Sequence, residues 1–251
     1  MFIPIGDDNS DRLRTPVINY IFLAINIAVF IFLQGMGSNA AFTFAYATVP
    51  AEILSGLDIT TPPKVQEVIT GQWVTVPGLQ PTPIPVYGTL ITSMFMHGGF
   101  AHLFGNMMYL WIFGDNLENI MGHLRYLFFY LLCGVLASLA HVFTSAYTGQ
   151  SDLIPSLGAS GAISGVLGGY MLLFPARRVH IWVLLTTISV PAFIAVGVWF
   201  LFQLINGLGA LGGSEAGGVA YAAHIGGFIA GLLLVKMFVP AQTISAQRRT
   251  F

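Results

Sequence analysis

The chain has 251 residues, of which 55% are hydrophobic and only 8% are charged, against roughly 25% charged residues in an ordinary soluble domain. This composition excludes a disordered chain and indicates a membrane protein. The net charge of −1 offers no basic surface for nucleic acid, and the single cysteine, Cys133, excludes an internal disulfide framework.

The charged residues leave six charge-free stretches of at least twenty residues each: 15–51, 68–114, 126–151, 153–176, 179–214 and 216–235. A bilayer core about 30 Å thick needs roughly 20 apolar residues per helix, so each stretch has room for one span. We therefore predict an all-α membrane protein with six transmembrane helices. Because no internal repeat is found, we expect a single domain over residues 1–251. The predicted helices lie near 17–34, 97–113, 125–145, 157–174, 179–206 and 219–239.

The first predicted helix follows a polar run over residues 6–11 and lacks a small-residue cleavage site, so we expect it to be retained rather than removed as a signal peptide. The long connection over 36–96 contains seven prolines, which break any continuous helix: Pro50, Pro62, Pro63, Pro77, Pro81, Pro83 and Pro85. Within this outer loop, the segment Ala51–Leu54 is expected to form a short interfacial helix.

The basic residues predict the orientation of these helices. With the N-terminus inside, Lys64 is the single basic residue of the outer segments, and the inner segments contain the other eight: Arg12, Arg14, Arg125, Arg177, Arg178, Lys236, Arg248 and Arg249. This distribution satisfies the positive-inside rule and predicts that both termini are cytoplasmic. Predicted helices two, four and six then all begin at the outer face.

Four polar residues lie early in these three helices and therefore share one depth: His102, Asn106, Ser160 and His224. At 1.5 Å per residue, each lies about 5–12 Å below the outer surface. Polar side chains inside a membrane are costly, so such a layer favours a functional site.

Ser160 is a candidate nucleophile within Gly158-Ala159-Ser160-Gly161. Small neighbours let a substrate backbone approach, and they leave the backbone amide of Ser160 accessible near a helix N-terminus. Taken alone, however, the residue fits helix packing better, because Gly161, Gly165 and Gly169 form small-xxx-small pairs.

His224 is the candidate general base, because imidazole exchanges protons near neutral pH. Gly227 and Gly231 follow at i+3 and i+7 on the same helical face, so that face can pack against the glycine-rich fourth helix and bring His224 to Ser160. The alternative is a histidine whose one role is an interhelical hydrogen bond.

His102 and Asn106 share a helical face at i and i+4, and both can donate hydrogen bonds to a developing oxyanion. Polar contacts between helices are the alternative role. His97 lies about 140° around the helix from His102, so the two do not naturally bind one metal ion.

Other intramembrane chemistries fit less well. The chain contains no His-Glu-x-x-His motif, every Asp and Glu falls at or outside a predicted helix end, and Cys133 lies in apolar surroundings that favour an inert thiol. We therefore expect no metal and no cofactor. A serine–histidine pair is what remains, and because no acid is placed to orient the histidine, we predict a dyad rather than a triad.

At this point the chain resembles the rhomboid family of intramembrane serine proteases over nearly its whole length. Four motifs in the expected order carry the resemblance: His97-x₄-His102-x₃-Asn106, Glu118-x₃-Gly122-x₂-Arg125, Gly158-x-Ser160-Gly161 and His224-x₂-Gly227.

The resemblance implies that Ser160 is the nucleophile and His224 the base, and that His102, Asn106 and the Ser160 backbone amide form the oxyanion hole. His97, Gly158, Gly161 and Gly227 would support the site, and Glu118 and Arg125 would stabilise the inner loop. The implied substrates are transmembrane helices that unwind near the outer face in lipid and are cleaved after a small residue.

Two features depart from the family pattern. Position 164 is serine, where some members carry an aromatic residue that packs against the histidine, and the loop over 36–96 lacks the Trp-Arg pair of some members.

The bare six-helix form resembles a prokaryotic member, so a bacterial or archaeal cell membrane is expected. The alternative functions are a non-catalytic relative that binds membrane clients and a small transporter. Two segments are candidates for the gate that admits substrate: the fifth helix, with Pro191 and Gly197 as flexible points, and the loop 207–218.

Overall fold

The computed structural model describes residues 2–67, 73–149, 152–211 and 220–240. Most of these residues are helical, and short strands form two separate sheets. In chain order the elements are β1 (Phe2–Asp7), α1 (Val17–Ala28), η1 (Val29–Leu33), η2 (Gly35–Gly37), α2 (Ala40–Tyr46), α3 (Pro50–Ser55), β2 (Lys64–Glu67), β3 (Trp73–Val76), η3 (Val86–Gly88), α4 (Thr89–Thr92), η4 (Ser93–Phe95), α5 (Phe100–Met121), α6 (His123–Thr148), α7 (Ser160–Leu173), β4 (Arg178–Val183), β5 (Thr186–Pro191), α8 (Ala192–Leu211) and α9 (Tyr221–Phe238).

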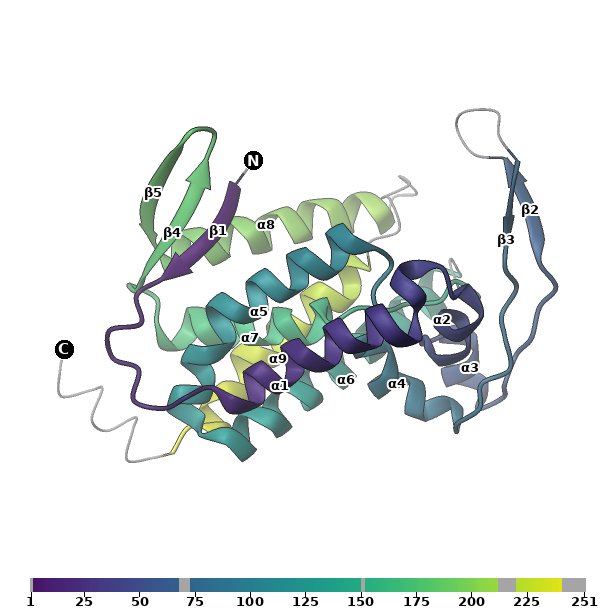
Figure 1. Ribbon diagram of the computed structural model, residues 1–251, viewed down its shortest axis with the longest axis horizontal. Helices are drawn as coiled ribbons and strands as arrows, with labels where there is room; N and C mark the ends of the chain where they lie inside the picture. The colour runs from purple at the N-terminus through teal and green to yellow at the C-terminus, as the bar shows by residue number, and fades with distance from the viewer. Residues whose placement is uncertain (1, 68–72, 150–151, 212–219, 241–251) are drawn as a thin grey trace.

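The centre of the molecule is α7, which contacts α5, α6, α8 and α9 (Figure 1). Every residue from Gly161 to Tyr170 is buried, as expected for a helix that is apolar or small on all sides. The helix is therefore packed on all sides, whereas its first residue, Ser160, is half-buried.

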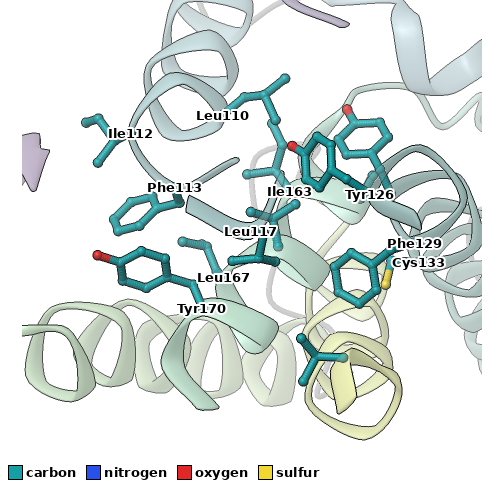
Figure 2. Packing of buried hydrophobic residues seen from close by; sticks show 14 of the residues in the cluster. Leu110, Ile112, Phe113, Leu117, Tyr126, Phe129, Cys133, Ile163, Leu167 and Tyr170 are labelled. Carbon is teal, nitrogen blue, oxygen red and sulfur yellow. The ribbon is translucent and has the colours of Figure 1, made fainter. Parts of the chain in front are cut away.

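The hydrophobic core fixes α5, α6 and α7 relative to one another (Figure 2). Leu110 and Leu117 of α5, Phe129 of α6 and Leu167 of α7 are all fully buried. Burying an aliphatic or aromatic side chain of this size contributes about 1.5–3 kcal/mol each. This shared core holds the three helices in fixed positions relative to one another and so fixes the position of the first residue of α7.

The predicted helices mostly have close counterparts. Residues 17–33 form α1 and η1, and α6 and α7 fall within three residues of their predicted bounds. The bounds of α9 lie within two residues of the predicted 219–239, of which residue 219 is outside the described residues. The second helix starts later than predicted, because Gly98 and Gly99 precede it, and it continues past residue 113 to Met121.

The predicted fifth helix over 179–206 is wrong in its first half. Residues 178–191 form the hairpin β4–β5, and α8 begins only at Ala192. Thr186, Thr187, Ile188 and Val190 are β-branched residues that favour a strand. The all-α expectation therefore needs correction: β4 also pairs with β1, which gives an antiparallel sheet in the order β1-β4-β5 beside α8 (Figure 1).

Membrane-spanning length is met by three of the described helices: His123–Thr148, Ala192–Gly209 and Tyr221–Phe238. Val17–Leu33, Val86–Phe95 and Ser160–Leu173 are apolar but shorter. The chain is thus a mostly helical membrane bundle, while the count of six spans and the cytoplasmic termini remain predictions. Arg248 and Arg249, which contributed to the predicted orientation, lie outside the described residues.

The predicted loop over 36–96 contains short helices and the two-stranded hairpin β2–β3, which extends away from the bundle (Figure 1). The short helix predicted at Ala51–Leu54 is confirmed as part of α3. Pro50 begins this helix, where the missing N–H of proline costs no hydrogen bond.

Glu118 connects α5 to the start of α1. The N-cap position of α1 is Pro16, which makes no side-chain capping bond. The fully buried carboxylate of Glu118 instead accepts hydrogen bonds from the backbone N–H groups of Ile18 at 2.9 Å and Asn19 at 2.8 Å. Two otherwise unpaired donors at the positive end of a helix are satisfied in this way. Arg125, from the same motif, is exposed.

Asp7, the last residue of β1, joins the sheet to the helices. Its carboxylate accepts hydrogen bonds from the Tyr170 hydroxyl of α7 at 2.5 Å and the Asn116 amide of α5 at 2.9 Å. Burial raises the pKa of Asp7 from 3.8 to about 7, and the nearby carboxylate of Asp115 acts in the same direction.

Candidate active site

Ser160 is the first residue of α7, so its backbone N–H has no acceptor within its own helix. The preceding turn needs glycine at position 158, where φ is +127°. A Cβ at that position would also lie 2.9 Å from Nε2 of His102. Gly158 therefore allows the backbone turn that leads into Ser160, and it lets the His102 ring lie close to that turn.

The Ser160 hydroxyl meets the imidazole of His224 directly. The distance from Ser160 Oγ to His224 Nε2 is 2.8 Å, which is within hydrogen-bond range. The two residues are far apart in the chain, and the contact is made by the first turns of α7 and α9.

Glycines on both helices make this contact possible. A Cβ on Gly227 would overlap the carbonyl oxygen of Gly161, and a Cβ on Gly231 would overlap that of Gly165. The backbones of α7 and α9 therefore approach as closely as small-xxx-small packing allows. The face of α9 predicted from Gly227 and Gly231 is the face that contacts α7.

The other ring nitrogen of His224 has a partner that sequence reasoning missed. Nδ1 lies 2.8 Å from the side-chain oxygen Oε1 of Gln203 in α8. The rings of Trp199, one turn earlier in α8, and Tyr221 lie 6.1 Å and 6.4 Å from the imidazole. A glutamine inside an apolar stretch is itself a signal of function, and it could have been found.

Ser164 makes its hydrogen bond within its own helix. Its hydroxyl donates to the backbone carbonyl of Ser160, 2.6 Å away within α7. The bracing that an aromatic residue at this position would provide comes instead from α8 and from Tyr221.

His102 and Asn106 lie one turn apart on α5, and His102 lies close to the turn that precedes Ser160. The His102 ring faces Gly158, and its Nδ1 accepts a hydrogen bond from the Gly98 backbone N–H at 3.3 Å. Asn106 is buried, and its Nδ2 donor has no hydrogen-bond partner among the described residues. An unpaired buried amide is costly, and a donor held ready in this way suits a ligand oxygen.

His97 lies behind His102, in the segment between η4 and α5. It is fully buried, and the two rings meet edge to face at 5.2 Å between centroids. The side chain of Gln34 holds the backbone of His97 through both its N–H and its carbonyl oxygen. Among the described residues, no three His, Cys, Asp or Glu side chains gather where they could bind one metal ion.

A small cavity opens beside Ser160 between α6, α7 and α9. Its lining consists mainly of small residues and serine hydroxyls: Ser93, Met94, Gly134, Ser138, Ser156, Leu157, Gly158, Ser160, Gly161, Ala162, Ala220 and Ala223.

Comparison with known proteins identifies the family. The model of the rhomboid domain matches residues 86–241, which is more than half of the chain. The chain belongs to the rhomboid family.

Curated rhomboid relatives cover parts of the chain. Rhomboid protease GluP of Bacillus subtilis is 30% identical over 213 residues, which are 83% of this chain and 35% of that protein. Mitochondrial Rhomboid protein 1 of Saccharomyces cerevisiae is 35% identical over 162 residues, 64% of this chain and 44% of that protein. The human mitochondrial presenilin-associated rhomboid-like protein is 30% identical over 177 residues, 64% of this chain and 43% of that protein.

These alignments cover less than half the length of each relative named above. The rhomboid fold and the apolar helices support an integral membrane protein. The expected bacterial or archaeal cell membrane is not supported, because the relatives include mitochondrial proteins as well as a bacterial one.

Proposed function

We propose that this rhomboid protein is an intramembrane serine endopeptidase that uses Ser160 as nucleophile and His224 as general base. The contact of 2.8 Å between Ser160 Oγ and His224 Nε2 carries the proposal. Serine is a weak nucleophile unless a base takes its proton, and this contact provides the base.

In the first step, Ser160 Oγ attacks the carbonyl carbon of the scissile peptide bond and its proton moves to His224 Nε2. The carbonyl oxygen becomes an oxyanion near the N-terminus of α7, where the Ser160 backbone N–H, the His102 ring and the Asn106 amide can donate to it. The imidazolium then gives its proton to the leaving amine, and an acyl-enzyme remains.

In the second step, His224 takes a proton from water, and the resulting hydroxide attacks the ester carbon of the acyl-enzyme. The imidazolium returns the proton to Ser160 Oγ as the ester bond breaks. The products are a new carboxyl group and a new amino group, and neither metal nor cofactor takes part.

The proposed substrates are transmembrane proteins in the lipid around the bundle. An intact helix shields its carbonyl carbons, so cleavage requires a segment that unwinds locally, and helix-destabilising residues in the substrate promote it. The small residues of the cavity beside Ser160 leave room for a small side chain next to the scissile bond.

A fluorophosphonate probe tests the nucleophile on the purified protein. We expect the parent protein to be labelled, and we expect Ser160→Ala and His224→Ala to lose labelling and peptide-bond cleavage while they keep the parent Tm. Equal labelling of Ser160→Ala and the parent would exclude Ser160. An unlabelled, inactive parent with a normal Tm would favour the alternative, a non-catalytic rhomboid protein that binds membrane clients.

A further inference from the structure

We propose that Gln203 of α8 is a positioning residue for His224, which it holds in the tautomer and orientation that Ser160 requires. The inference rests on the proposed function, because the tautomer of His224 matters only if this residue acts as the base.

The hydrogen bonds at the two ring nitrogens determine the tautomer. Oε1 of Gln203 is a carbonyl oxygen and can only accept, so the Nδ1 atom 2.8 Å away carries the proton. Nε2 then has a free lone pair, and the Ser160 hydroxyl at 2.8 Å donates to it. This is the arrangement in which a neutral imidazole can take the serine proton.

The position of Gln203 suits this role. Gln203 is only 6% exposed, and it lies in a helix whose residues are mostly apolar. A buried amide costs free energy unless it is hydrogen-bonded, and the imidazole of His224 supplies a donor. Trp199 precedes Gln203 by four residues and shares its helical face, so α8 contacts His224 through both side chains.

A neutral amide here fits the electrostatics of the site. Among the described residues, the titratable groups that act on His224 are the imidazoles of His102 and His141, and no carboxylate is among them. A carboxylate in the place of Gln203 would need to be desolvated inside the bundle, which is expensive without a permanent cation beside it. The amide orients the ring without that cost, which explains why the predicted dyad lacks an acid.

The experiment compares the full-length parent with Gln203→Leu and Gln203→Glu in detergent or lipid. Asn206→Leu is the matched control, because Asn206 lies one turn later on α8 and, among the described residues, its side chain donates to the carbonyl of Phe202 in its own helix. For each protein, kcat and KM for a transmembrane substrate and the rate of fluorophosphonate labelling are measured from pH 5 to pH 9, together with Tm.

We expect Gln203→Leu to lower kcat about 10- to 100-fold with little change in KM, because one hydrogen bond to a group that becomes charged is lost. We expect Gln203→Glu to keep more activity than Gln203→Leu and to shift the acidic limb of its profile to higher pH, because a carboxylate favours the imidazolium. Asn206→Leu should match the parent.

A Gln203→Glu profile that superimposes on the parent profile would overturn the inference, and so would a folded Gln203→Leu with kcat within twofold of the parent. If Gln203→Leu does not fold, the Gln203→Glu profile decides alone. In all of these cases labelling of the parent and its loss in Ser160→Ala still test the proposed function separately.

Discussion

At the scale of single residues, the site combines side chains that are hydrogen-bonded to one another with a side chain whose donor has no partner among the described residues. Ser160, His224 and Gln203 form a hydrogen-bonded row across three helices. Asn106 of α5 is buried, and its amide donor has no partner within the part of the chain that the structure describes. Paired groups hold the base and nucleophile in place, whereas the unpaired donor is free for an oxygen that exists only when substrate is bound.

This difference predicts how Asn106→Ala behaves. We expect kcat to fall about 100- to 1,000-fold, as for the loss of one oxyanion donor, while Tm changes little, because no hydrogen bond among the described residues is lost. Turnover of the substrate and thermal unfolding are measured on the same preparation. A rate within threefold of the parent would remove Asn106 from the oxyanion hole.

At the scale of elements, the close packing of α7 and α9 sets the distance between nucleophile and base. Gly231 of α9 approaches the carbonyl of Gly165 in α7 so closely that a Cβ would overlap it. Gly231 lies two turns away from His224 along α9. Because a helix is stiff over two turns, a larger separation of α7 and α9 at Gly231 also increases the distance between Ser160 and His224.

We therefore expect Gly231→Ala to lower stability by about 1–3 kcal/mol through overpacking and to lower kcat as well. Gly197→Ala on α8 is the control, because a Cβ at Gly197 meets nothing within 4 Å. That substitution should be neutral or stabilise by up to about 1 kcal/mol. Thermal unfolding compares the two; equal Tm values would mean that α9 can move without cost.

The elements also show what sequence reasoning could and could not reach. Ser160, His224 and the glycine face of α9 were predictable, because i+3 and i+7 spacing fixes which residues share a face. The β4–β5 hairpin was not, because an uncharged stretch with β-branched residues satisfies hydropathy as a helix and as a strand alike. Gln203 was missed although a glutamine inside an apolar stretch is a signal of function, because the spacing of residues within α8 does not show which neighbouring helix this side chain faces.

At the scale of the whole molecule, the sheet β1-β4-β5 is joined to the helical bundle through Asp7. The Tyr170 and Asn116 side chains that donate to Asp7 come from α7 and α5, so this carboxyl group links three parts of the fold. Its pKa of about 7 places its titration within the range of ordinary buffers.

The sign of the pH dependence follows from this raised pKa. Between about pH 4 and pH 7 the folded protein holds a proton on Asp7 that the unfolded chain releases, so the contribution of Asp7 to stability is lost as the pH rises and levels off above 7. Asp7→Asn cannot titrate at this position, so its Tm should decline less than that of the parent over this range. Tm measured from pH 4.5 to pH 8 compares the two proteins; parallel curves would contradict the assignment.

The pairing of β1 with β4 also has a consequence for biosynthesis. Phe2 pairs with Val183, so β1 leaves the ribosome well before its partner β4, which is made after α1, α5, α6 and α7. At about 5–20 residues per second, this interval lasts roughly 10 to 40 s. During that time β1 is an unpaired edge open to other chains. The order of synthesis therefore leaves β1 unpaired until β4 has been made, and β5 is the last strand of this sheet to be made.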